Sequence, residues 1–80
     1  MRIPRDVSAE ELVKSLNKLG YQKTRQVGSH IRLTIVKSQI QYHITIPNHN
    51  PIKIGTLNSI LKVVSTHLSI SKEDLLKKIF

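Results

Sequence analysis

The sequence predicts an α+β fold in which helices cover one face of a three-stranded antiparallel sheet. Three observations lead to this prediction. One helical pattern opens the chain, three short segments of alternating polar and apolar residues follow, and two further helical patterns close it. The predicted order is α-β-β-β-α-α, and a chain of 80 residues is expected to form one domain over residues 1–80.

The first helix is expected over about residues 8–19. Ser8 and Glu11 form a capping box, in which the serine hydroxyl accepts an early backbone N–H of the helix. Gly20 follows and suits the left-handed conformation that ends many helices. Leucines recur between these ends at helical spacing, at Leu12, Leu16 and Leu19.

Three strands are expected next, over residues 21–27, 30–36 and 40–46. The first is polar and suits a sheet edge, Gly28-Ser29 predicts a turn or bulge, and Lys37-Ser38-Gln39 predicts a hairpin. Strict alternation in the second and third strands indicates one buried and one solvated face. The open face is expected to carry His30, Arg32, Thr34, His43 and Thr45.

Two helices are expected after the proline-rich stretch 47–51, which breaks regular structure. Thr56 is expected to cap the second helix, and His67 is expected to interact with its C-terminus. Ser71 is expected to cap the last helix. The apolar stripes of the two helices are Leu57, Ile60, Leu61, Val64 and Leu68, then Leu75, Leu76 and Ile79.

The distribution of charge favours a polyanionic partner. The net charge is +8, and no acidic residue lies between Glu11 and Glu73, whereas nine Lys or Arg residues and all four histidines do. Nucleic acid is the most plausible partner for such a surface, with solvated surface charge as the plainer alternative. A two-metal nuclease needs carboxylates to hold Mg²⁺, so histidine is the expected reagent if this protein cleaves nucleic acid.

The composition also bears on the compartment. The chain has no cysteine, which excludes disulfides and thiolate metal sites and suits a reducing cytoplasm. No apolar run approaches membrane-spanning length, and the first residues do not form a signal peptide, so no membrane partner is expected. No metal or other cofactor is expected either.

His30 is the leading candidate for chemistry. It begins a strand on the expected open face, directly after a Gly-Ser pair that permits close approach by a ligand. An exposed histidine can donate or accept a proton near neutral pH, although an ordinary surface histidine is the alternative. His49, in the proline-rich loop, could contact phosphate, act as a second acid or base, or only stabilise the loop. His43 could lie near His30 across the sheet, but the three histidines match no metal motif.

Basic residues are expected to cluster around the open face and the loop, where they could contact phosphate: Lys23, Arg25, Arg32 and Lys53. Aromatic residues are scarce, and Tyr21 and Tyr42 are interpreted as core. This interpretation argues against a sheet that stacks unpaired bases.

The ordered motifs of the chain resemble those of HicA-type toxins, the small mRNA interferases of toxin–antitoxin pairs. The resemblance covers nearly the whole chain. It depends on Leu19-Gly20-Tyr21, on Arg25-Gln26-Val27-Gly28-Ser29-His30, on Ile44-Thr45-Ile46-Pro47-Asn48-His49, and on Gly55-Thr56-Leu57 with Ile60-Leu61-Lys62. The glycine-containing hairpin usual in the family is replaced here by Lys37-Ser38-Gln39.

The resemblance implies a fold like that of the double-stranded-RNA-binding domain and an endoribonuclease that cleaves mRNA with one catalytic histidine, here His30. It implies RNA-binding roles for residues around that histidine: Lys23, Arg25, Gly28, Ser29, Arg32, His49 and Lys53. The implied partner is a HicB-type antitoxin that covers the active site, and no direct DNA binding is expected. Two alternatives stay open: a non-catalytic double-stranded-RNA-binding module, and an adaptor whose basic surface meets an acidic protein.

Overall fold

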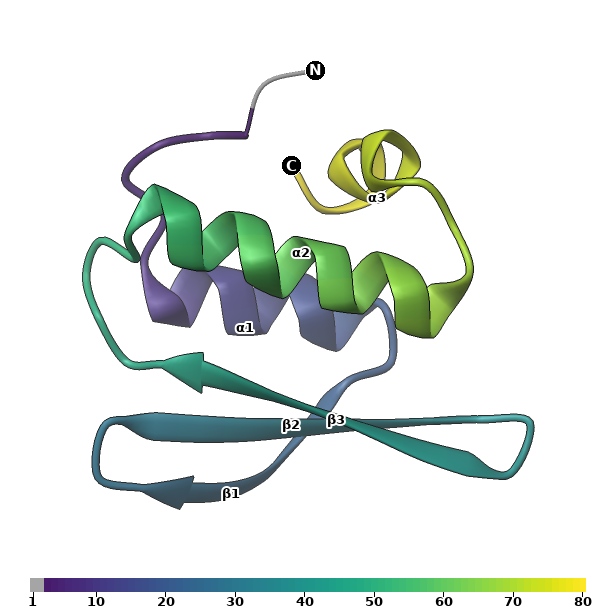
Figure 1. Ribbon diagram of the computed structural model, residues 1–80. Helices are drawn as coiled ribbons and strands as arrows, with labels where there is room; N and C mark the ends of the chain where they lie inside the picture. Colours follow the sequence, from purple (N-terminus) through teal and green to yellow (C-terminus); the bar gives the residue numbers. More distant parts are fainter. Residues whose placement is uncertain (1–2) are drawn as a thin grey trace.

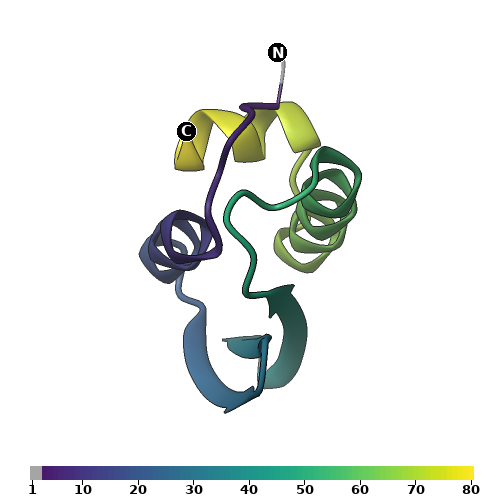
Figure 2. The ribbon, with the colours of Figure 1, turned by 90° about the vertical axis from the view of Figure 1, so that its left-hand side faces the viewer.

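The computed structural model describes residues 3–80 and has the predicted α+β order of elements, α-β-β-β-α-α. The elements are α1 (Ala9–Lys18), β1 (Gln22–Val27), β2 (His30–Lys37), β3 (Ile40–Pro47), α2 (Ile54–Leu68) and α3 (Lys72–Ile79). The strands form an antiparallel sheet in the order β1-β2-β3. Helices α1 and α2 lie side by side over one face of this sheet, and α3 lies across them on the side away from the sheet (Figures 1 and 2).

The buried apolar side chains form one cluster that extends from the sheet to α3. Strands β2 and β3 contribute Ile31, Leu33, Ile35, Ile44 and Ile46, α1 and α2 contribute Leu12, Leu16, Leu57, Ile60, Leu61 and Val64, and α3 adds Leu75, Leu76 and Ile79. These sheet residues alternate along each strand, so all of them face the helices. Within residues 3–80, no helix covers the opposite face of the sheet, as the alternation predicted (Figure 2).

The predicted caps of the first and last helices are confirmed. Ser8 Oγ accepts from the Glu11 backbone N–H at 3.1 Å, and Ser71 Oγ accepts from that of Asp74 at 3.0 Å. The cap predicted for α2 at Thr56 was wrong, whereas the helix and its buried apolar stripe are present.

Helix α2 begins at Ile54 rather than after a cap at Thr56, and its N-cap residue, Lys53, makes no side-chain cap. The preceding Ile52 is buried and its N–H donates to the Val7 carbonyl at 2.8 Å. This contact lies outside the helix and fixes where α2 can start. The propensity of Thr56 to cap a helix therefore does not decide the first residue of α2.

A β-bulge in β1 decides which face its cations occupy. Lys23 pairs with Leu33 and Arg25 pairs with Arg32, so the pairing passes over Thr24. Without the bulge, the alternation would put Lys23 and Arg25 on one face. With it, Arg25 shares the open face with Arg32, whereas Lys23 lies on the helix side with Leu33.

Two tight turns close the hairpins of the sheet. Gly28 has a φ of 56°, a left-handed conformation that glycine adopts readily, and this turn joins β1 to β2. The β2–β3 turn contains Ser38 and Gln39, both with positive φ (52° and 67°). Positive φ at both central residues is the signature of a type I′ turn, which matches the twist of the flanking strands.

His67 joins α2 to the sheet through two tyrosines. The buried Tyr21 hydroxyl lies 2.8 Å from His67 Nδ1, and the His67 and Tyr42 rings have centroids 4.8 Å apart. His67 lies in the last turn of α2, where an interaction with the helix C-terminus was expected, and the core role expected for both tyrosines is confirmed. Burial raises the pKa of Tyr21 to about 12. Burial, followed by the charge of His43, lowers the pKa of His67 below its ordinary value.

The lowered pKa of His67 predicts a loss of stability on mild acidification. Above pH 6.5, the ordinary histidine value, His67 is neutral in both folded and unfolded chains, so its stabilising contribution is complete. As the pH falls below this value, the unfolded chain binds the proton first, and the free energy of unfolding drops. The variant His67→Gln does not titrate and can still accept from the Tyr21 hydroxyl. Urea unfolding between about pH 7 and about pH 5 should show a smaller loss for this variant; parallel curves for the two proteins would contradict the prediction.

Candidate nucleic-acid interface

His30 lies at the first position of the central strand, on the open face of the sheet. Its side chain is exposed, and its backbone pairs with Val27 on β1 and Pro47 on β3. The left-handed Gly28 and the next residue, Ser29, make the turn that brings the chain into this position. Pairing with both neighbouring strands therefore fixes the backbone of His30, while its ring stays accessible to a ligand.

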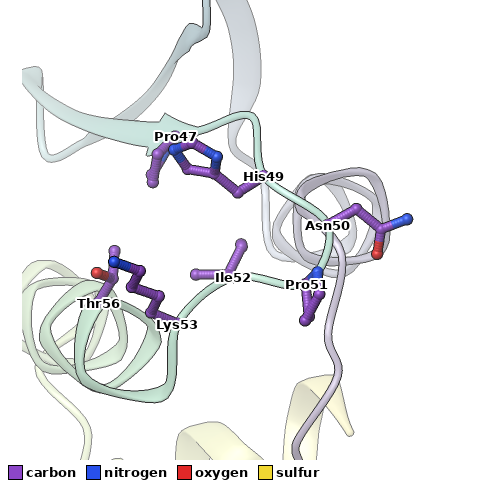
Figure 3. Close-up of a pocket in the computed structure, with 7 residues that line it drawn as sticks. All are labelled: Pro47, His49, Asn50, Pro51, Ile52, Lys53 and Thr56. Atoms are coloured by element: carbon purple, nitrogen blue, oxygen red, sulfur yellow. The ribbon is translucent and has the colours of Figure 1, made fainter.

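A depression of about 380 Å³ lies beside this end of the sheet, between the β3–α2 loop and the start of α2. Figure 3 shows the His49 ring next to Pro47 on one wall, with the Lys53 and Thr56 side chains on the facing wall. Pro47 belongs both to this depression and to the pair with His30. The depression and the histidine at the strand end are therefore neighbouring parts of one surface.

Backbone hydrogen bonds fasten the β3–α2 loop to its surroundings. The Asn48 N–H donates to the Ser29 carbonyl at 2.6 Å, next to His30 in the chain. The His49 carbonyl accepts from the Ala9 N–H, at the start of α1, at 3.1 Å. The position of His49 relative to the Gly28-Ser29 turn is thus set by backbone contacts on both sides of the loop.

Arg25 and Arg32 are directly paired across β1 and β2 on the open face. Like charges in this arrangement repel one another unless an anion lies between them. Within residues 3–80 the structure contains one ion pair, Lys14 with Glu10 on α1, so neither arginine has a carboxylate partner there. The pair therefore forms a site suited to a phosphate group.

A chain of hydrogen bonds crosses the open face further along the sheet. Thr24 Oγ1 lies 2.9 Å from Thr34 Oγ1, which lies 2.9 Å from His43 Nδ1. The network spans all three strands and depends on the bulge that brings Thr24 to this face. The sequence indicated that Thr34 and His43 share a face, but gave no signal for their contact or for the part played by Thr24.

All but one of the expected site residues fall into two groups. Arg25, Gly28, Ser29, His30 and Arg32 lie on the open face or in its turn, and His49 and Lys53 line the adjoining depression. Lys23 belongs to neither group, since it lies with Glu10, Val13 and Lys14 beside α1. The placement expected for Lys23 was wrong because of the bulge.

The expected proximity of His43 to His30 was also wrong. His43 pairs with Thr34, four positions along β2 from His30, which corresponds to ~14 Å. Among the residues that the structure describes, no three His, Asp or Glu side chains are grouped so that they could hold a metal ion. No helix in residues 3–80 is both long enough and apolar enough to span a membrane.

These features define a class: small α+β proteins whose uncovered sheet face is cationic and ends in an accessible histidine. A family model described as the HicA toxin of bacterial toxin-antitoxin matches residues 9–64, from α1 into α2. Because the match covers more than half of the chain, the protein belongs to the HicA toxin family, which assigns it a toxin role and implies a HicB-type antitoxin as its partner. The matched region includes His30, His49 and the arginine pair. Comparisons with curated proteins and with solved structures found no match.

Because Arg25 and Arg32 face one another without a carboxylate partner among residues 3–80, removing one of the two charges is predicted to stabilise the fold at low salt. Replacing Arg25 by Gln removes the cross-strand repulsion and should raise the free energy of unfolding by a few tenths of a kcal/mol. The gain should disappear at high salt, where exposed charges are screened. Denaturant unfolding at two salt concentrations measures the effect, with Lys62→Gln as a control that removes one exposed charge from α2. Equal gains in both variants would indicate relief of net charge instead of a specific pair.

Proposed function

We propose that this toxin is an endoribonuclease that cleaves mRNA without a metal ion, with His30 as a catalytic residue. The observation that carries the proposal is the position of His30: exposed, at the end of the central strand, beside the arginine pair and the loop depression. Membership of the HicA family supports the toxin role. The cytoplasm, where mRNA is translated, is the proposed site of action.

RNA supplies the nucleophile for this reaction. The 2′-OH attacks the adjacent phosphorus, so that the O2′–P bond forms as the P–O5′ bond breaks. One general base accepts the 2′-OH proton and one general acid protonates the leaving O5′, giving a 2′,3′-cyclic phosphate and a 5′-OH end. His30 performs one of these two proton transfers.

His49 is the candidate for the second transfer. Tyr42 also carries a hydroxyl that could exchange a proton, but it packs against the core and His67 on the covered side of the sheet. His49 instead follows Pro47, the ladder partner of His30, and its ring lies beside that proline in Figure 3. The residue before His49, Asn48, donates its backbone N–H to the Ser29 carbonyl, in the turn that precedes His30.

The cations near His30 would stabilise the negative charge that develops on the phosphorane-like transition state. Arg25 and Arg32 lie next along the sheet, and Lys53 lies across the depression from His49. Such donors are most effective when they are fixed before the substrate arrives. The strand ladder supplies that rigidity for the arginine backbones, and the start of α2 supplies it for Lys53.

The antitoxin is proposed to cover the open face and hide His30. An acidic inhibitor would be attracted to a protein of net charge +8, and steering of this kind speeds association. Covering His30 also excludes RNA from the reacting centre. Competition between RNA and the antitoxin for the toxin would support this arrangement, and a ternary complex with uncut RNA and an exposed His30 would oppose it.

The variant His30→Ala should lose cleavage and toxicity while it keeps its fold. Loss of one general acid or base typically lowers a rate by ~10²–10⁴-fold. Because the side chain is exposed, the free energy of unfolding should change by less than ~0.5 kcal/mol. Gln41→Ala, an exposed residue at the other end of the same face, is the matched control.

The measurements for this variant are growth after induction, cleavage of purified mRNA and thermal unfolding. A folded His30→Ala protein that is fully toxic would end the catalytic assignment. If wild type binds RNA without cutting it, the non-catalytic binding module becomes the better description.

A substrate with deoxyribose at the scissile position should resist cleavage, because it lacks the 2′-OH nucleophile. The all-ribose substrate should be cut equally well with and without EDTA, since the region between Glu11 and Glu73 has no carboxylate to bind Mg²⁺. Gel analysis of end-labelled oligonucleotides measures both outcomes. Efficient cutting of the deoxy substrate would contradict internal attack, and loss of activity in EDTA would contradict metal independence.

A further inference from the structure

The open face is organised in three rows of residues that cross the strands. The first row contains His30, the second contains the Arg25–Arg32 pair, and the third contains Thr34 with its partner His43. Successive rows lie two residues apart, or ~7 Å along the sheet. This interval is close to the separation of successive phosphates along an RNA strand.

The ring of His43, in the third row, is oriented by a hydrogen bond to a neighbouring strand. Its Nδ1 is engaged by Thr34, whose hydroxyl is in turn within hydrogen-bond distance of Thr24. The second ring nitrogen, Nε2, has no hydrogen-bond partner among residues 3–80, and the side chain is exposed. The ring therefore has a fixed orientation and one free polar atom directed away from its threonine partners.

We propose that His43, oriented by Thr34 and Thr24, forms a second RNA subsite that contacts a phosphate two nucleotides from the scissile one. The inference rests on the proposed function, which places the scissile phosphate at His30. The arginine pair then holds the intervening phosphate, and the strand of RNA runs along β2 over all three rows. His43 acts here in binding and takes no part in the proton transfers.

The substrate class that fits this track is single-stranded RNA. Attack by the 2′-OH requires O2′, phosphorus and O5′ to lie nearly in line, and the regular A-form duplex holds the 2′-OH away from that line. An unpaired strand can adopt the in-line geometry at His30 and still extend across the other two rows. A polar ladder that only stabilises the sheet is the competing explanation for the Thr24–Thr34–His43 network.

The test measures how affinity depends on the length of the RNA. Oligonucleotides centred on a mapped cleavage site carry one deoxyribose at the scissile position, so that they bind without being cut, and are extended one nucleotide at a time on either side. Dissociation constants are measured at low salt for wild type, His43→Ala and Thr34→Val. Gln41→Ala, two residues from His43 on the same face of β3, is the matched control.

For wild type, adding the nucleotide that reaches the third row should tighten binding by roughly five- to tenfold, the usual net effect of one hydrogen bond. His43→Ala should lose this step, Thr34→Val should reduce it, and Gln41→Ala should keep it. All four proteins should bind the shortest oligonucleotide equally. Thr34→Val retains His43 and tests the network even if His43→Ala does not fold.

Two results would overturn the subsite. One is that His43→Ala and Thr34→Val both keep the gain in affinity on adding the nucleotide that reaches the third row. The other is that these variants lose the same affinity for oligonucleotides of every length. Failure of the proposed function has a different signature. In that case His30→Ala would still cleave an all-ribose oligonucleotide, whatever the length dependence of binding. A duplex that binds as tightly as the single strand, with the same dependence on His43, would contradict the substrate class alone.

Discussion

The arrangement of this molecule depends on burial of one face of β2. Ile31, Leu33 and Ile35 pack beneath α1 and α2, and period-two geometry then forces the residues between them onto the opposite face. A shift of the ladder by one residue would expose the core and bury the polar set, so the hydrophobic effect fixes both sets together. The position of His30, the leading functional residue, therefore follows from the packing of the core. The exposed side chain of His30 itself contributes little to the stability of the fold.

The features that could be predicted from the sequence are those determined by residues close together in the chain. Ser8 and Ser71 cap their helices because a hydroxyl meets an N–H three residues away, and alternation separated Leu33 from Arg32 without knowledge of the partner strands. The features that were missed depend on distant parts of the chain. The start of α2 is set by the contact of Ile52 with Val7. The faces on which Lys23 and Arg25 lie are set by the β-bulge between them, which depends on pairing with β2.

The same distinction applies to the candidate site. The sequence located His30 on the open face, together with Arg32, because both follow the alternation of a regular strand. It placed Lys23 wrongly and could not specify the Thr24–Thr34–His43 network, since both outcomes follow from the bulge. One inserted residue thus turns Lys23 away from the open face and supplies the Thr24 hydroxyl to the row of Thr34 and His43. The bulge concentrates polar groups on the face that the helices leave uncovered, which is the surface proposed to bind RNA.

The turn between β2 and β3, at the far end of the sheet from His30, offers a route for protein engineering. Ser38 and Gln39 both have positive φ, a conformation that asparagine and glycine adopt with less strain. An Asn-Gly pair at these two positions would stabilise the hairpin without altering any side chain of the three rows. A scaffold strengthened in this way would tolerate substitutions that otherwise unfold the protein, so defects in recognition could be separated from defects in folding.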